Sequence, residues 1–161
     1  MPRAHARLPF AVLMAFVAFV ATMAGVGCGG GGGGSKPVAP GPPAGSISEV
    51  EPNDSLPQAL GALGATDLVV SGSAASSGDV DLYSVTLAET TNVYMSLAWT
   101  GGSDLEVGLT DTSGILIHNQ DSPTANPEQC VINARPPGTY RVRVGSHSSS
   151  ATSYALTLGR R

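Results

Sequence analysis

Four oxygen-bearing side chains fall within six consecutive residues: Glu49, Glu51, Asn53 and Asp54. Hard cations such as Ca²⁺ bind about six to eight oxygens from carboxylates, amide carbonyls and the backbone. Pro52 favours an extended conformation of Glu51, and along an extended segment Glu49, Glu51 and Asn53 alternate onto one side. The spacing predicts a calcium site, but a strand start or an Asx turn without metal would use the same residues.

The common catalytic motifs are missing from the sequence, which has no HExxH, no Gly-x-Ser-x-Gly elbow, no phosphate-binding loop and no CxxC pair. His147 lies between two serines in a predicted loop, and neighbours in sequence do not form a catalytic triad by proximity alone. Cys130 lies in an apolar run and is expected to be a small buried core residue. The sequence therefore predicts a protein that is not an enzyme.

The elements that would position these residues are strands, because apolar and polar residues alternate with a period of two and no helical stripe is present. Each run has one apolar and one mostly polar face, as in antiparallel sheets with one side exposed to water. Residues 56–63 give a weak helical signal, interrupted by Pro57, Gly61 and Gly64, and we expect a short turn there. We predict an all-β fold, an antiparallel, jelly-roll-like β-sandwich. About eight strands are expected, at residues 67–73, 83–87, 92–99, 104–110, 115–119, 129–133, 139–144 and 153–158.

The first 27 residues have the features of an export signal, with Arg3 and Arg7 ahead of an almost wholly apolar stretch. Small residues precede Cys28 and resemble a bacterial lipobox, in which Cys28 is lipidated and becomes the mature N-terminus. Secretion without a lipid and an uncleaved membrane helix are the alternatives. Residues 28–46 are expected to be the lipidated cysteine and a Gly/Pro-rich linker, which leaves one domain at residues 47–161.

The charge of the exported part is acidic, because removal of the signal leaves six basic against twelve acidic residues. Nucleic-acid binding needs a basic footprint, so nucleic acid is not an expected partner, whereas cations would be attracted. If Cys28 is lipidated, Cys130 is the remaining thiol and no intramolecular disulfide is expected. We expect a monomer.

Three motifs in the second half of the chain, at residues 49–54, 78–83 and 137–144, occur in a characteristic order. Residues 103–107 and 111–114 lie between them, and residues 153–158 follow like a closing strand. In this order they resemble the bacterial pre-peptidase C-terminal domain, a small β-sandwich usually appended to secreted enzymes. The resemblance covers about residues 47–159 and implies the same sandwich.

The resemblance also implies a set of site residues. In members known as collagen-binding modules of bacterial collagenases, an acidic N-terminal stretch and aspartates of a later turn chelate calcium. Those modules also use a strip of exposed aromatic side chains, and Tyr94 is the one clearly outward aromatic here. The implied calcium ligands are Glu49, Glu51, Asn53, Asp54, Asp79 and Asp81.

Together these features predict a non-catalytic, exported lipoprotein that is tethered to a bacterial membrane and displays a calcium-stabilised β-sandwich. The tether would hold the domain at the cell surface or facing the periplasm. Two alternatives remain for its role: a collagen- or polysaccharide-binding surface module, and an accessory subunit of a separately encoded secreted enzyme. An extracellular polymer or a protein is the expected ligand in either case.

Overall fold

The computed structural model describes residues 46–161. The predicted signal peptide, Cys28 and nearly all of the predicted linker lie outside the described residues and remain predictions. Among the described residues, no helix is long and apolar enough to cross a membrane.

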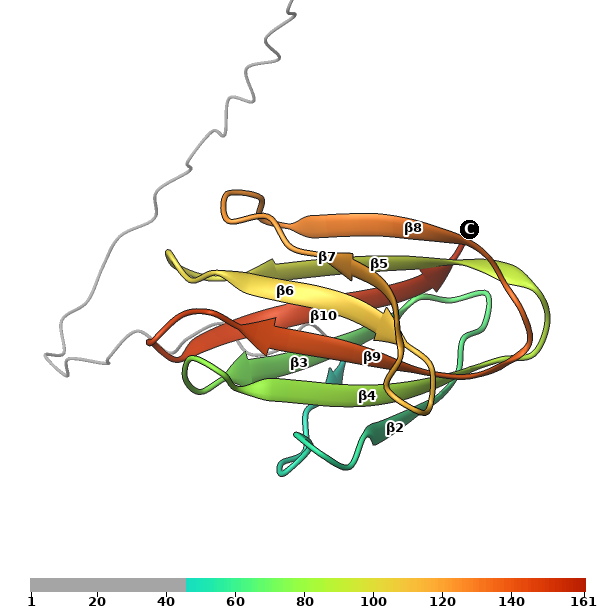
Figure 1. The fold of residues 1–161 in the computed structure, drawn as a ribbon, viewed down its shortest axis with the longest axis horizontal. Coiled ribbons are helices and arrows are strands. Elements are labelled where there is room, and N and C mark those ends of the chain that lie inside the picture. The colour runs from blue at the N-terminus through green and yellow to red at the C-terminus, as the bar shows by residue number, and fades with distance from the viewer. Residues whose placement is uncertain (1–45) are drawn as a thin grey trace, which may run out of the picture. The chain divides into compact units, whose positions relative to one another are not determined.

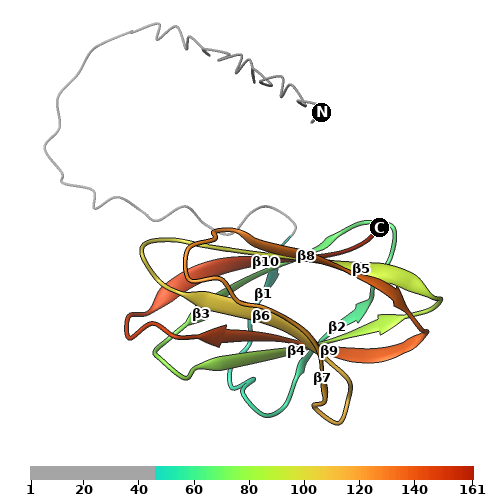
Figure 2. The ribbon, with the colours of Figure 1, turned by 45° about the horizontal axis from the view of Figure 1, so that its top comes forward.

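Two five-stranded sheets pack face to face in a sandwich (Figure 1). The strand order is β1-β3-β10-β5-β8 in one sheet and β2-β4-β9-β6-β7 in the other, and Figure 2 shows both layers. The strands are β1 (Ile47–Ser48), β2 (Gln58–Ala62), β3 (Leu68–Ala74), β4 (Val80–Leu87), β5 (Thr91–Trp99), β6 (Leu105–Thr110), β7 (Leu116–Gln120), β8 (Glu128–Arg135), β9 (Gly138–Ser146) and β10 (Thr152–Arg160).

The predicted all-β sandwich is confirmed, and ten strands are present where about eight were expected. The two additional strands are β1 and β2, which pair in parallel with β3 and β4, while all the other pairs are antiparallel. The expectation of a short turn at residues 56–63 was wrong, because β2 occupies most of that segment. Strand β2 tolerates its glycine because the register shifts between Ala59 and Gly61, and Gly61 takes a φ of 88°.

The core lies between the sheets and is built from the alternate residues that the sequence pattern predicted. Val85 on β4, Leu97 on β5, Leu109 on β6 and Leu156 on β10 are among its fully buried members. Each of these strands turns its other face outward, and on β6 the outward residues are buried as well.

Four connections lie together at one end of the sandwich, on the left in Figure 1. They are residues 75–79, 100–104, 121–127 and 147–151, and the segment between β1 and β2 reaches the same end because β1 runs parallel to β3. We call this end the acidic end, since nine of the chain's twelve acidic residues lie there. Those nine are Glu49, Glu51, Asp54, Asp79, Asp81, Asp104, Glu106, Asp121 and Glu128.

One close approach between neighbouring strands depends on a glycine. Gly72 of β3 pairs with Tyr154 of β10, and a Cβ at Gly72 would lie 2.5 Å from the Tyr154 hydroxyl oxygen. Tyr154 is 4 % exposed and its hydroxyl is hydrogen-bonded, so its ring has little room to move. We therefore expect Gly72→Ala to lower the free energy of unfolding by about 1–3 kcal/mol, as overpacking does.

The measurement is chemical denaturation, with Gly64→Ala as the matched control because nothing lies within 4 Å of a Cβ built at Gly64. Equal stability of the two variants would contradict this account of the Gly72–Tyr154 contact.

Candidate metal centre

Two carboxyl groups and two phenols meet between the sheets at the acidic end. Glu49 follows β1, Asp81 and Tyr83 point inward from β4, and Tyr154 points inward from β10 of the other sheet. Tyr83 donates a hydrogen bond to Glu49 Oε1 at 2.8 Å. The Tyr154 hydroxyl lies 2.9 Å from the same Glu49 oxygen and 2.7 Å from Asp81 Oδ2, and it also contacts the Tyr83 hydroxyl. We call these four residues the carboxyl–tyrosine network.

The segment after Glu49 is held against the start of β4 by Asn53. Asn53 is 1 % exposed, and its side-chain amide donates to Glu49 Oε1 at 3.1 Å. Its backbone oxygen accepts from the Leu82 N–H at 3.3 Å, and its own N–H donates to Glu51 Oε2 at 2.9 Å. These bonds place Glu51 and Asp54 on either side of a buried Asn53, beside the first residues of β4.

Asp79 reaches the same place from the turn between β3 and β4. Gly78 takes a φ of 85°, which a glycine adopts without strain, and Asp79 Oδ2 accepts from the Ala75 N–H. The backbone oxygen of Asp79 accepts from the Ser146 N–H at 3.1 Å, which ties the turn to the end of β9. The turn is thus fixed from both sides.

The four carboxylates of Glu51, Asp54, Asp79 and Asp81 each offer an oxygen, and these oxygens all lie within 4.8 Å of one another. One of the Asp81 oxygens, Oδ1, and the Asn53 side-chain oxygen, Oδ1, are buried without a hydrogen-bond partner. Buried oxygens are normally paired, and a set of carboxylate and amide oxygens is what Ca²⁺ prefers. The residues present therefore fit a calcium ion.

The structure brings together four of the six residues predicted as ligands and gives the other two distinct surroundings. Asn53 lies between Glu51 and Asp54 in the sequence and has a buried side-chain oxygen without a hydrogen-bond partner. Glu49 has its oxygens occupied, because Oε2 accepts from the Ser73 N–H at 2.8 Å and Oε1 accepts from Asn53 and the phenols. These contacts suit Glu49 to a role in positioning the other residues of the site.

The pKa values of the network follow from burial and proximity. Burial, opposed by the Tyr154 hydrogen bond and reinforced by the nearby Glu49 and Asp79 charges, raises the pKa of Asp81 to about 8. Burial would also raise the pKa of Glu49, but hydrogen bonds from Ser73, Tyr83 and Tyr154 outweigh it, and the pKa of Glu49 is lowered. Burial raises the pKa of both tyrosines. Without a cation, the folded domain is left with Glu49 ionised and Asp81 protonated near neutral pH.

Tyr83 and Tyr154 stand at inward positions of β4 and β10, which alternation along these strands favours, but sequence reasoning missed their hydroxyl contacts. The available signal was Asp81, which stands two residues before Tyr83 and therefore points to the same inward face of β4. A carboxyl group at an inward strand position needs polar partners, and inward tyrosines supply them.

Two other residues discussed from sequence have different surroundings. Tyr94 is half-buried on β5, and the Arg161 guanidinium lies over its ring at 4.3 Å from the centroid. Cys130 is a free thiol on β8, partly buried against the core, and burial together with the nearby Glu128 charge raises the pKa of the thiol. Tyr94 is therefore already covered by a cation, and Cys130 has the inert character expected of a core cysteine.

The chain matches a known protein family over part of its length. Residues 79–146 match the bacterial pre-peptidase C-terminal domain family. The matched stretch runs from Asp79 to the end of β9, so it contains two of the predicted ligands and leaves residues 49–54 outside. No curated protein matches the chain in sequence.

One of the similar solved structures shows the same fold. The pre-peptidase C-terminal domain of a collagenase from Bacillus anthracis aligns with a TM-score of 0.54 at 19 % identity, covering 68 % of this chain and 99 % of that one. A periplasmic inhibitor of g-type lysozyme from Aeromonas hydrophila aligns with a TM-score of 0.44 at 15 % identity, over 65 % and 98 %. A carbohydrate-binding module solved with calcium and xylotriose aligns with a TM-score of 0.38 at 15 % identity, over 55 % and 78 %. The first alignment shows the shared fold, and the other two are too distant to support more.

The raised pKa values predict how stability depends on pH when calcium is removed. Asp81, and Glu128 with a pKa raised to about 7 by burial and then by the charges of Asp121 and Asp104, bind protons more tightly in the folded chain than in the unfolded chain. Their stabilising contribution is complete below about pH 4 and is lost as pH rises through about 7 to 8. In EDTA, the melting temperature should therefore fall between about pH 5 and about pH 9.

Asp81→Asn should flatten the upper part of this dependence, since an amide keeps the shape of a protonated carboxyl without titrating. Glu128→Gln is the comparison variant, because it removes the contribution of Glu128, the group with the lower pKa of the two. A wild-type melting temperature that is constant or rises over this range would contradict the assignment.

Proposed function

We propose that this chain is an exported, non-catalytic module whose β-sandwich is stabilised by Ca²⁺ at the acidic end. The observation that carries the calcium assignment is the pair of buried, unpartnered oxygens on Asn53 and Asp81 beside four converging carboxylates. Glu51, Asp54, Asp79 and Asp81 would hold the ion together with Asn53, and Glu49 would position Asn53. Bound calcium would neutralise carboxylates that otherwise repel one another.

The absence of catalytic motifs and the match to the pre-peptidase C-terminal family support a non-catalytic role. Domains of this family accompany secreted enzymes, so the partner is expected outside the cytoplasm. We propose that the sandwich is displayed from a lipidated Cys28 and a Gly/Pro-rich linker, as the sequence predicts. Binding of an extracellular polymer, such as collagen or a polysaccharide, and association with a separate secreted enzyme remain the two candidate roles of the displayed domain.

Tyr94 bears on the first of these roles. The Arg161 guanidinium over its ring also donates to Asp67 Oδ2 at 2.8 Å, so both the Tyr94 ring and the Asp67 carboxylate hold the guanidinium in place. A ligand that stacks on Tyr94 must displace Arg161 or use the Tyr94–Arg161 pair as one surface. One covered ring offers less aromatic contact surface than the strip of aromatic side chains in collagen-binding modules. It therefore favours a ligand that also makes charged contacts.

Calcium should raise the thermal stability of the purified protein. Binding to the folded state alone stabilises by about 2.7 kcal/mol at a hundredfold excess over Kd, which for a domain of this size is a rise in Tm on the order of 10 °C. Asp79→Asn and Asp81→Asn should abolish most of the rise. In EDTA, Asp81→Asn should be at least as stable as wild type near pH 8, because it removes a buried charge that has no ion-pair partner.

The matched control is Glu89→Gln, which removes an exposed carboxylate paired with Arg160 at the opposite end of the sandwich and should leave the calcium response intact. The calcium assignment fails if millimolar calcium leaves Tm unchanged, or if both aspartate variants respond to calcium like wild type.

A further inference from the structure

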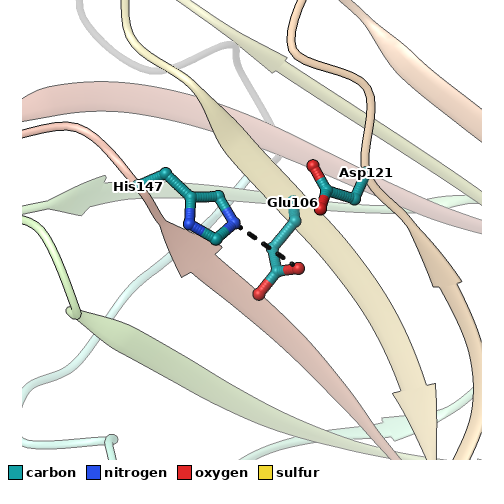
Figure 3. A group of neighbouring side chains, drawn as sticks. All are labelled: Glu106, Asp121 and His147. Atoms are coloured by element: carbon teal, nitrogen blue, oxygen red, sulfur yellow. Dashed lines mark ion pairs between the residues drawn. The ribbon is translucent and has the colours of Figure 1, made fainter.

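A second group of possible metal ligands lies on the outer surface of the β2-β4-β9-β6-β7 sheet, apart from the predicted calcium ligands. Figure 3 shows its three members: Glu106 on β6, Asp121 just after β7, and His147 just after β9. The strand register places them together, because Glu106 pairs with Gly145 and Val107 pairs with Gln120. We call Glu106, Asp121 and His147 the outer-face group.

Glu106 is unusual because it points away from the core and is only 7 % exposed. Two glycines make this possible. A Cβ at Gly145 would lie 2.6 Å from Glu106 Oε1, and a Cβ at Gly108 would lie 3.0 Å from the Asn119 side-chain oxygen. The surface is thus hollowed around a carboxylate, which side chains at either position would obstruct.

The Glu106 carboxylate is held in a fixed orientation. Arg143 donates to Oε1, and Asn119 Nδ2 donates to Oε2 at 2.9 Å. Burial alone would raise the pKa of Glu106, but these hydrogen bonds and the Arg143 charge outweigh it and lower the pKa. Polar contacts of this kind behind a carboxylate are typical of the groups that orient metal ligands.

The Glu106 carboxylate also faces His147 and Asp121. His147 Nε2 lies 3.7 Å from Glu106 Oε2, which is longer than a direct hydrogen bond. Two ligand atoms on one tetrahedral Zn²⁺, each at about 2.0–2.1 Å, are separated by about 3.4 Å. One atom from each member of the group lies within 4.8 Å of the others, so small side-chain movements would bring all three onto one ion.

The chemistry of the donors distinguishes this group from the calcium ligands. Calcium prefers an all-oxygen set of about six to eight ligands, whereas one imidazole nitrogen and two carboxylates suit Zn²⁺ and neighbouring transition metals. Arg143 already offsets one of the two carboxylate charges. The imidazole adds no charge when neutral, so the group as a whole leaves one negative charge to attract a cation.

We propose that Glu106, Asp121 and His147 bind a divalent transition-metal ion of the Zn²⁺ class, with Asn119 and Arg143 orienting Glu106. Three protein ligands leave at least one coordination position for water or for a donor from a ligand or partner. His147, whose side chain is 50 % exposed, also lines a surface groove with Gly102, Ser103 and residues 148–150. The His147 side of the site is therefore open to solvent.

Isothermal titration of the purified protein with Zn²⁺, in saturating calcium, tests the proposal. We expect one zinc ion per chain, with affinity at least about tenfold weaker in His147→Gln and in Asp121→Asn, as loss of a metal ligand or its support requires. Titration with Co²⁺ should give the visible absorption of a site with a nitrogen ligand, and His147→Gln should lose it. Because His147 is half exposed and Asp121 is exposed, these variants should fold normally.

Two control variants separate this site from others that could take up zinc. Cys130→Ser removes the one described thiol and Asp81→Asn alters the predicted calcium site, and both should keep the affinity for zinc. Absence of zinc binding, or binding that His147→Gln leaves unchanged, would overturn the proposal. Binding that Cys130→Ser or Asp81→Asn abolishes would overturn it as well.

Discussion

The sandwich depends on a small hydrogen-bonded network that is short of positive charge. Tyr83, Tyr154, Glu49 and Asp81 make four close contacts between oxygens, yet the two phenols supply only two protons for them. A proton on Asp81 would supply a third hydrogen-bond donor, whereas a bound cation would neutralise the negative charge of the carboxylates. Because Tyr83 and Asp81 belong to one sheet and Tyr154 to the other, this choice directly affects how the two sheets are joined.

The rest of the acidic end follows from the same constraint. Two carboxylates, those of Glu49 and Asp81, belong to the network, and those of Glu51, Asp54 and Asp79 lie at the same end of the sandwich. Among the described residues none of these five forms an ion pair. On the outer surface of the β2-β4-β9-β6-β7 sheet, Arg143 already compensates part of the negative charge of the outer-face group. One end of a simple sandwich thus carries two chemically different groups of candidate cation ligands. One is made of oxygens around the buried Asp81, and the other contains an imidazole and lies on the outer face of a sheet.

Much of this arrangement was predictable from the sequence, since alternation located the strands of both sheets and the spacing of residues 49–54 suggested oxygen ligands. The separate roles of Glu49 and Glu51 were not predictable from the sequence. Glu49 is taken up by contacts with Tyr83 and Tyr154, which come from distant strands, and Glu51 is left to bind a cation. Strand β1 is too short to show alternation, and the glycine in β2 suggested a turn. The outer-face group was missed because Glu106, Asp121 and His147 are brought together only by strand register.

The most direct test of the network is the number of protons released when calcium binds. Calorimetric titration near pH 7, repeated in buffers of different ionisation enthalpy, measures that number. Our account predicts release of about one proton per calcium ion in the wild-type protein, because the metal displaces the proton from Asp81. Calcium binding without proton release would show that Asp81 is already ionised in the absence of metal, and would contradict the account.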